Sequence, residues 1–238
     1  MRAKRTAPAL LAVFSLVLLA ACNDRLFDNP LDPDAELRAY EILSTIQTDI
    51  VPLDLTFSGD ALWAVDVGSR VVALNHNSGA LIRELDVQLP AGGIAYDGKD
   101  LWLSVRDTPQ LVQVSIINGS QIRMLKLLRG SFGALDYFSG RLYVSDRLTN
   151  AVLVVDPENG TIERSIPQPS FAIDGVCHDG ASLWTIDATQ MKLFRLTASG
   201  AQVNQYQTPS RNPSGLAFAS GILWCGDRTG KIFKLRFP

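Results

Sequence analysis

A leucine–aromatic pair recurs five times along the chain at a nearly constant interval, and this repeat limits the possible folds more than any other feature. The intervals between successive pairs are 39, 41, 41 and 40 residues. The pairs are Leu62-Trp63, Leu101-Trp102, Leu142-Tyr143, Leu183-Trp184 and Leu223-Trp224. A turn glycine lies just ahead of each pair: Gly59, Gly98, Gly140, Gly180 and Gly221. Such a period is typical of proteins built from repeated supersecondary units.

Each repeat contains four short runs with the composition of β-strands. In the third repeat these runs read ALDYF, RLYVSD, AVLVVD and TIERSI. Their alternation and β-branched content favour strands, and the chain lacks the long 3.6-residue periodicity that helical repeats need. A second series of turn glycines lies out of phase with the first: Gly79, Gly119, Gly160 and Gly200. Four short strands in each unit of about 40 residues predict the blades of a β-propeller.

The two ends of the repeat region predict how the ring closes. The last repeat ends at Pro238, directly after its third strand-like run. The run AYEILSTI, residues 39–46, has no repeat of its own and aligns with the fourth strand-like runs at 80–87 and 120–127. We therefore expect residues 39–238 to form one all-β domain, a five-bladed β-propeller with Velcro-type closure by an N-terminal strand.

The first 38 residues predict export and a lipid anchor. Residues 1–21 combine a basic start with an apolar stretch, as in a signal peptide. The stretch ends in the sequence LLAAC, residues 18–22, which resembles a bacterial lipobox with Cys22 as the lipidated residue. The alternative is an ordinary secretory signal followed by a chance cysteine. Residues 22–38 are acidic and contain Pro30 and Pro33, which favours an extended linker.

This N-terminus predicts a lipid-anchored protein of the bacterial cell envelope, on the periplasmic side or in the outer membrane. Removal of residues 1–21 would leave 19 basic and 24 acidic side chains. A nucleic-acid-binding protein normally carries a basic excess, so we expect no nucleic-acid partner. His76 and His178 are the only histidines, which argues against a His-rich metal site, and no sequence motif indicates a cofactor or a metal.

Two repeated positions have both a structural and a functional interpretation. The aromatic residues of the five pairs are expected in the core between blades, although a ring of aromatics is also found in sugar-binding sites. An acidic residue follows the aromatic by three positions in four repeats: Asp66, Asp146, Asp187 and Asp227. These carboxylates are expected to cap turns by accepting backbone N–H bonds, the alternative being a polar rim that holds a cation.

Residues that depart from the repeat are the candidate ligand contacts. They lie in or next to loops that we expect at one face of the ring, around the channel mouth. The candidates are Arg106, Asp107, Arg147, Asp174, Arg211 and Arg228. No catalytic residue is assigned to the chain.

Cys177 and Cys225 lie in apolar strand positions of neighbouring repeats. Export to an oxidising compartment would permit a disulfide between them, but two free buried thiols are the favoured interpretation. Motifs for catalysis are absent: no Gly-x-Ser-x-Gly occurs, and residues 226–231 only superficially resemble a phosphate loop. A single histidine such as His178, with no identified nucleophile, is more often structural.

The pattern Leu-Trp-x-x-Asp, followed by a turn and an apolar strand, resembles the NHL/YVTN-type propeller repeats of secreted bacterial proteins. The five-blade count is similar to that of the plant-type glutamine cyclotransferase group. The first-blade sequence of that group, Phe-Thr-Gln-Gly-Leu, does not occur, and the nearest match is Asn-Pro-Ser-Gly-Leu at residues 212–216. The resemblance covers residues 39–238 and identifies a repeat rather than an activity.

Three functional hypotheses follow. The first is a non-catalytic binding or scaffolding module for a protein, peptide or glycan, favoured by the regular repeats and the tether. The second, implied by the resemblance, is an enzyme of the glutaminyl cyclotransferase or lactonase type that uses acidic residues at the channel mouth. The third is a purely structural subunit of a larger envelope complex.

Overall fold

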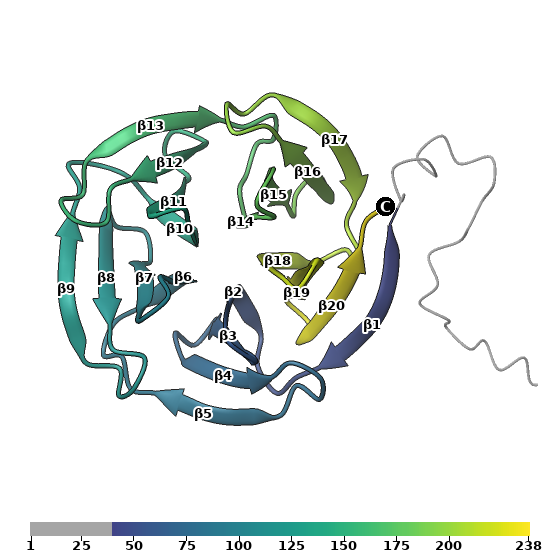
Figure 1. Cartoon of the computed structure of the whole chain (residues 1–238), viewed down its shortest axis with the longest axis horizontal. Coiled ribbons are helices and arrows are strands. Elements are labelled where there is room, and N and C mark those ends of the chain that lie inside the picture. The colour runs from purple at the N-terminus through teal and green to yellow at the C-terminus, as the bar shows by residue number, and fades with distance from the viewer. Residues whose placement is uncertain (1–39) are drawn as a thin grey trace, which may run out of the picture.

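The structure, a computed structural model, describes residues 40–238 as five four-stranded antiparallel sheets arranged around a central axis (Figure 1). This confirms the five-bladed β-propeller. The strands are β1 (Glu41–Gln47), β2 (Pro52–Ser58), β3 (Ala61–Asp66), β4 (Val71–Asn75), β5 (Leu81–Leu85), β6 (Ala91–Tyr96), β7 (Leu101–Val105), β8 (Gln110–Val114), β9 (Gln121–Lys126), β10 (Phe132–Phe138), β11 (Arg141–Asp146), β12 (Ala151–Val155), β13 (Ile162–Pro167), β14 (Gly175–His178), β15 (Leu183–Asp187), β16 (Lys192–Leu196), β17 (Gln202–Gln207), β18 (Pro213–Ala219), β19 (Ile222–Asp227) and β20 (Lys231–Arg236).

The connections between strands fall at two ends of the ring. The innermost strands are β2, β6, β10, β14 and β18, and each blade runs outward from its innermost strand. Because the strands of a blade alternate in direction, the hairpins that join first to second and third to fourth strands lie at one end, here called the hairpin end. The connections from second to third strands, and those from one blade to the next, lie at the other end, here called the crossover end.

Strand β1 closes the ring. It pairs antiparallel with β20, in a register that runs from Glu41 opposite Arg236 to Gln47 opposite Lys231, and so supplies the outer strand of the last blade. The strand begins two residues later than the predicted range of 39–46 and extends one residue further. Because β20 starts at the crossover end, the antiparallel strand β1 starts at the hairpin end. The chain therefore enters the propeller from the hairpin end.

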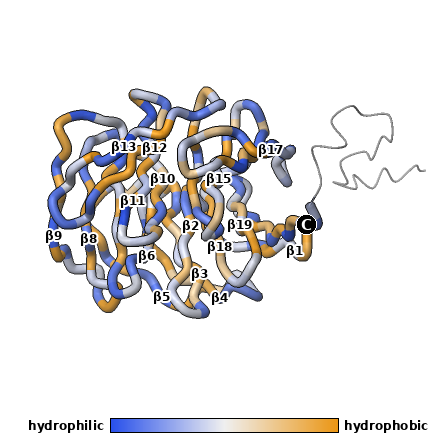
Figure 2. Tube along the Cα trace, turned by 45° about the horizontal axis from the view of Figure 1, so that its top comes forward, coloured by the Kyte–Doolittle hydropathy of each residue, from blue (hydrophilic) through white to orange (hydrophobic). Residues whose placement is uncertain are grey.

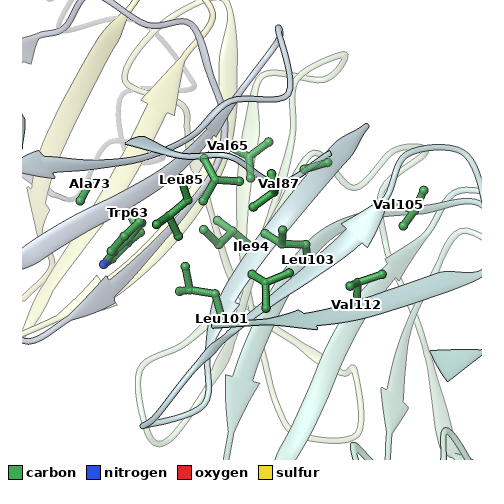
Figure 3. Close-up of a cluster of buried hydrophobic side chains, with 13 residues drawn as sticks. Trp63, Val65, Ala73, Leu85, Val87, Ile94, Leu101, Leu103, Val105 and Val112 are labelled. Atoms are coloured by element: carbon green, nitrogen blue, oxygen red, sulfur yellow. The ribbon is translucent and has the colours of Figure 1, made fainter. Parts of the chain in front are cut away.

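The hydrophobic core lies between blades rather than within them. One cluster joins Trp63 and Val65 of the first blade to Ile94 and Leu103 of the second (Figure 3). Four further clusters link the other neighbouring pairs in the same way, including the last blade with the first. Figure 2 shows the polar and apolar residues alternating along much of the trace, as expected for strands.

The repeated aromatic position belongs to this core. The five side chains are all buried: Trp63, Trp102, Tyr143, Trp184 and Trp224. The prediction of a packing role is confirmed.

The cysteines of the propeller are free. Cys177 and Cys225 are both buried and form no disulfide, which confirms the favoured interpretation. Burial raises the pKa of both thiols, because a thiolate would lose its hydration there.

The predicted signal peptide (1–21) and the whole of the predicted linker (22–38), with the lipidation site at Cys22, lie outside the described residues. Within residues 40–238, no helix has the length and apolar character required to span a bilayer.

Deletion of residues 39–46 should destabilise the whole domain, because β20 would lose its outer partner and the last blade would present an open edge. We expect a loss of at least about 3 kcal/mol in the free energy of unfolding, since Ile46 also leaves its buried cluster. Thermal unfolding followed by circular dichroism measures the effect. An unchanged melting temperature would refute closure by β1.

Two isoleucines on β1 provide a matched comparison with that deletion. Ile46 is buried and Ile42 is exposed. Ile46→Ala should cost about 2–4 kcal/mol, whereas Ile42→Ala should change the stability by less than about 1 kcal/mol.

Candidate functional site

The centre of the ring is filled by a carboxyl group. The innermost strands approach so closely that one repeated position tolerates little side chain: it is Gly93, Ala134, Gly175 and Gly215 in four blades. A Cβ on Gly215 would lie 2.2 Å from the Cα of Asp54. The first blade places Asp54 at this position, fully buried.

Asp54 joins three blades through its side chain. Its Oδ2 accepts the backbone N–H of Ile94 at 2.9 Å and that of Leu135 at 2.8 Å, which belong to the second and third blades. Its Oδ1 is buried without a hydrogen-bond partner. Burial raises the pKa of Asp54 well above its ordinary value, although the N–H bonds from Leu135 and Ile94 oppose the change.

The acidic residues at the ends of the second strands cap turns, as predicted. Asp146 Oδ1 accepts the N–H groups of Ser131 and Leu148, at 2.8 and 3.1 Å. Asp187 Oδ2 accepts those of Phe171 and Ala172, at 3.0 and 3.1 Å. The carboxylates are thus used to hold neighbouring connections together. Within residues 40–238, no group of three His, Cys, Asp or Glu residues is arranged to hold a metal ion.

Three of the candidate arginines occupy one repeated position, directly after the second strand of a blade. The position holds Arg106, Arg147 and Arg228 in the second, third and fifth blades, with Val67 and Ala188 in the others. The backbone N–H of each arginine donates to the carbonyl of Pro90, Ser131 or Asn212, in the connection that leads into the same blade. Equivalent backbone geometry therefore directs three guanidinium groups to the crossover end around the axis.

These arginines and Asp174 line a pocket of about 180 Å³ at the mouth of the channel. Four of the six predicted contacts are thereby brought together. The other lining residues are Leu53, Val67, Gly92, Phe132, Gly133 and Ala134. Leu53 directly precedes Asp54 in the sequence, and Ala134 occupies the position of Asp54 in the third blade, so the pocket lies near the inner strands.

The charged groups of the mouth differ in how firmly they are held. Arg228 Nη2 donates to Asp174 Oδ1 at 2.9 Å, and Asp174 Oδ2 accepts the N–H of Ala188 at 2.9 Å. Arg106 donates from Nη2 to the carbonyl of Ala91 at 3.0 Å, while its Nε is buried without a partner. Arg147 makes only a 3.5 Å contact with the exposed Asp107, which leaves its guanidinium the most available of the three.

Two candidates lie outside the pocket. Asp107 is exposed beside Arg147, and Arg211 is exposed in the connection between β17 and β18. Asp54 was missed by the sequence reasoning, which considered the acids at the ends of the second strands. An alignment of the innermost strands, in which the other blades have only Gly or Ala at this position, contains the signal.

His178 belongs to the hairpin end and not to the mouth. Its backbone N–H donates to Asp136 Oδ2 at 2.8 Å, and its Nδ1 lies 3.2 Å from the same oxygen. Its ring stacks on Phe138, with 4.6 Å between centroids. These contacts place His178 in the packing between the third and fourth blades.

A second hollow, of about 370 Å³, lies at the outer side of the crossover end between the first two blades. Two of its three charged lining residues, Arg70 and Glu84, contact each other at 3.5 Å, and Arg70 also pairs with Asp66 at 2.8 Å. The third, Asp86, accepts a hydrogen bond from Gln88. The channel mouth is therefore the stronger candidate site.

Comparison with known proteins supports the fold. No protein-family model and no curated protein matches the sequence. Among solved structures, the glutaminyl cyclase of Myxococcus xanthus is similar with a TM-score of 0.70, over 84% of this chain and 96% of that chain, at 16% identity. The virginiamycin B lyase of Staphylococcus aureus is similar with a TM-score of 0.53, over 80% and 67%, at 16% identity. A streptogramin B lyase is similar with a TM-score of 0.53, over 84% of this chain and 98% of that chain, at 14% identity. At these identities the likeness concerns the propeller fold.

Asp54→Asn should alter how stability depends on pH. Because the folded state raises the pKa of Asp54, it binds the proton more readily than the unfolded chain. The contribution of Asp54 is therefore greatest below its ordinary pKa of about 3.9 and declines as the pH rises toward the folded pKa. The free energy of unfolding of the wild type, minus that of the variant, should fall from pH 4 to pH 8 in urea titrations.

Asp60→Asn is the control for this measurement, since Asp60 is exposed at the hairpin end. Its stability should follow the wild-type pH dependence. If the free energies of unfolding of the wild type and Asp54→Asn depend on pH in the same way, the raised pKa of Asp54 is contradicted.

Proposed function

We propose that this chain is a lipid-anchored propeller of the bacterial cell envelope, and that it acts as a non-catalytic binding or scaffolding module for a protein, peptide or glycan. The channel mouth is its binding site. The observation that carries the proposal is the convergence of Arg106, Arg147 and Arg228 on one pocket at one end of the ring. A repeated position that is arginine in only three blades is not required by the fold.

The chemistry of the pocket favours binding over catalysis. Its lining residues include no Ser, Thr, Cys, His or Lys that would act as a nucleophile or base. Its one carboxylate, Asp174, already accepts hydrogen bonds from Arg228 and from the backbone of Ala188. Guanidinium groups in such a setting recognise carboxylate or phosphate groups of a ligand.

The proposed tether agrees with this site. The chain enters β1 from the hairpin end, opposite the channel mouth. A lipid on Cys22 would therefore hold the protein to the membrane through the end of the propeller that does not bind the ligand, and leave the mouth accessible to a partner.

Pull-downs from envelope extracts with the chain lacking residues 1–22 test the proposed function. Arg147→Glu should abolish retention of partners, because it places an acid in the pocket without disturbing a buried contact. Lys99→Glu at the exposed hairpin end is the control and should retain them. A chain that retains no partner and turns over a small substrate would contradict the proposal.

Replacement of Cys22 should release the protein from the membrane. After expression in a bacterial host, we expect the wild type in the membrane fraction with incorporated labelled palmitate. Cys22→Ala should lose the label and leave the membrane pellet. Labelling or membrane retention that persists in Cys22→Ala would overturn the anchor, and Cys177→Ala serves as the control for loss of an unrelated thiol.

An enzyme of the glutaminyl cyclotransferase type is the second candidate, favoured by the structural similarity to the glutaminyl cyclase of M. xanthus. The acid in the mouth would be Asp174. Formation of pyroglutamate from a peptide with an N-terminal Gln measures this activity. If the enzyme hypothesis holds, Asp174→Asn should lower the rate by about 100-fold or more. An absence of turnover would favour the binding module.

A further inference from the structure

We propose that the crossover end is a docking surface for a protein or peptide that inserts an acidic side chain into the mouth and covers an apolar arc over the third and fourth blades. This inference rests on the proposed binding function and specifies the partner. It is drawn from the distribution of charge, from the exposed apolar residues and from the size of the pocket.

Charge is distributed unequally between the two ends. Among residues 40–238, the hairpin-end turns contain one lysine, Lys99, and six acidic residues: Asp60, Asp97, Asp100, Asp156, Glu158 and Asp179. The crossover-end connections contain four acidic residues and six arginines: Arg70, Arg106, Arg129, Arg147, Arg211 and Arg228. Four further acids end the second strands at this end, but they are buried and accept backbone N–H bonds: Asp66, Asp146, Asp187 and Asp227. An approaching acidic group would therefore be favoured at the crossover end and repelled at the hairpin end.

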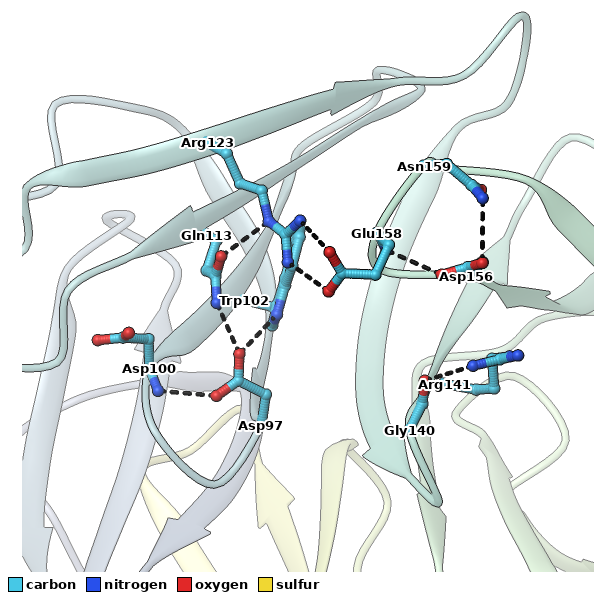
Figure 4. A network of polar contacts seen from close by, with 10 residues as sticks. All are labelled: Asp97, Asp100, Trp102, Gln113, Arg123, Gly140, Arg141, Asp156, Glu158 and Asn159. Atoms are coloured by element: carbon cyan, nitrogen blue, oxygen red, sulfur yellow. Dashed lines mark hydrogen bonds and ion pairs between the residues drawn. The ribbon is translucent and has the colours of Figure 1, made fainter.

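Many acids of the hairpin end serve the fold itself. Asp97 accepts the indole N–H of Trp102 at 3.0 Å and the amide of Gln113 at 2.7 Å, and Glu158 pairs with Arg123 (Figure 4). Asp179 accepts the indole N–H of Trp184 in the same way as Asp97 does for Trp102. The hairpin end thus has a structural reason for its charge. At the mouth, Arg228 is firmly paired with Asp174, whereas Arg147 has only the long contact with Asp107 and Arg106 donates to neutral oxygens.

Exposed apolar side chains also concentrate at the crossover end. Of 13 large exposed hydrophobic residues in the described chain, seven lie on outer strands, and Ile117 is the one in a hairpin-end turn. The crossover end holds the other five: Val67, Leu128, Leu148, Phe171 and Met191. Connections need not expose such residues, since the turns at the opposite end are almost entirely polar.

Four of these residues form the apolar arc, defined as Leu128, Leu148, Phe171 and Met191. They lie on consecutive connections, from the one that enters the third blade to the one within the fourth. Hydrogen bonds join these connections: Arg147 N–H donates to Ser131 O, and Phe171 N–H donates to Asp187 Oδ2. These bonds hold neighbouring connections together at the crossover end, and Leu148 directly follows the pocket residue Arg147.

The volume of the pocket indicates what kind of group it can bind. A volume of about 180 Å³ is below the roughly 300–1,000 Å³ of sites that enclose a whole small-molecule ligand. It accommodates one short side chain, and most of the contact must then come from the surface around it. An acidic residue flanked by apolar residues matches both the arginines and the arc, whereas a glycan would stack on the ring of Phe171 but leave the aliphatic Leu128, Leu148 and Met191 without apolar partners.

Arg147 is suited to exchange its partner on binding. Its contact with Asp107 is long, at 3.5 Å, and both side chains are at least half exposed, so the pair adds little to stability. A carboxylate entering the mouth would replace Asp107 at the guanidinium, in a site with less water. The fold thus positions the guanidinium of Arg147 at the mouth, where its ion pair with Asp107 is weak.

Panning a random dodecapeptide display library on the full chain in detergent tests this inference. A printed array of neutral and acidic glycans is probed in parallel. We expect enriched peptides with Asp or Glu flanked by aromatic or aliphatic residues, and an affinity that weakens with added salt. Resynthesis of an enriched peptide with Asp→Asn or Glu→Gln should weaken binding about 10-fold or more.

Two pairs of matched variants locate the contact on the protein. Arg147→Gln and Phe171→Ser should each weaken the binding of the enriched peptide about 10-fold. Lys99→Gln and Ile117→Ser, at the hairpin end, should leave the affinity unchanged. Phe171 and Ile117 are 83% and 78% exposed, so neither serine variant should disturb folding.

The outcomes separate this inference from the proposed function. Enriched peptides without acids, or binding unaffected by Arg147→Gln and Phe171→Ser, would overturn the docking surface. Glycans bound through the mouth, with no enriched peptide, would overturn the choice of a protein partner and leave the binding function intact. If no peptide is enriched and no glycan binds, both the docking surface and the proposed binding function are overturned.

Discussion

The whole structure depends on closure of the ring. Each blade buries its apolar faces only against the two neighbouring blades, as the cluster of Trp63 with Ile94 and Leu103 illustrates. A gap between the first and last blades would expose the corresponding surfaces of both. The pairing of β1 with β20 therefore stabilises the whole domain. Ile46 of β1 also packs in the hydrophobic core between the last and first blades.

Closure also determines what the axis of the molecule can contain. The innermost strands approach so closely that Gly93, Gly175 and Gly215 leave no space for side chains, and Asp54 fills the centre. The carboxyl group satisfies N–H groups from two other blades, which otherwise face a channel without partners. The mouth pocket is lined instead by Leu53, which directly precedes Asp54, and by Ala134, which occupies the position of Asp54 in the third blade.

The site is built by changing side chains at a position that the repeat has already oriented. The backbone after the second strand is held by the same kind of N–H bond in several blades, and arginine at three of these positions makes a cationic mouth. Side chains at this position can thus vary with little cost to the core. Under the proposed binding function, the exposed arc that includes Leu148 and Phe171 would extend the site onto the surface and be buried by the partner.

The amino-acid sequence was enough to predict the blade count, the strand pattern and the closing strand, because the 40-residue period and the alternation along strands are local signals. It also indicated six residues that depart from the repeat at one end of the ring: Arg106, Asp107, Arg147, Asp174, Arg211 and Arg228. The folded structure was needed to show that Arg106, Arg147, Asp174 and Arg228 share a pocket while Asp107 and Arg211 lie outside it, since side-chain direction depends on packing between blades. The role of Asp54 likewise follows from distances across the axis, between strands about 40 and 80 residues apart in sequence.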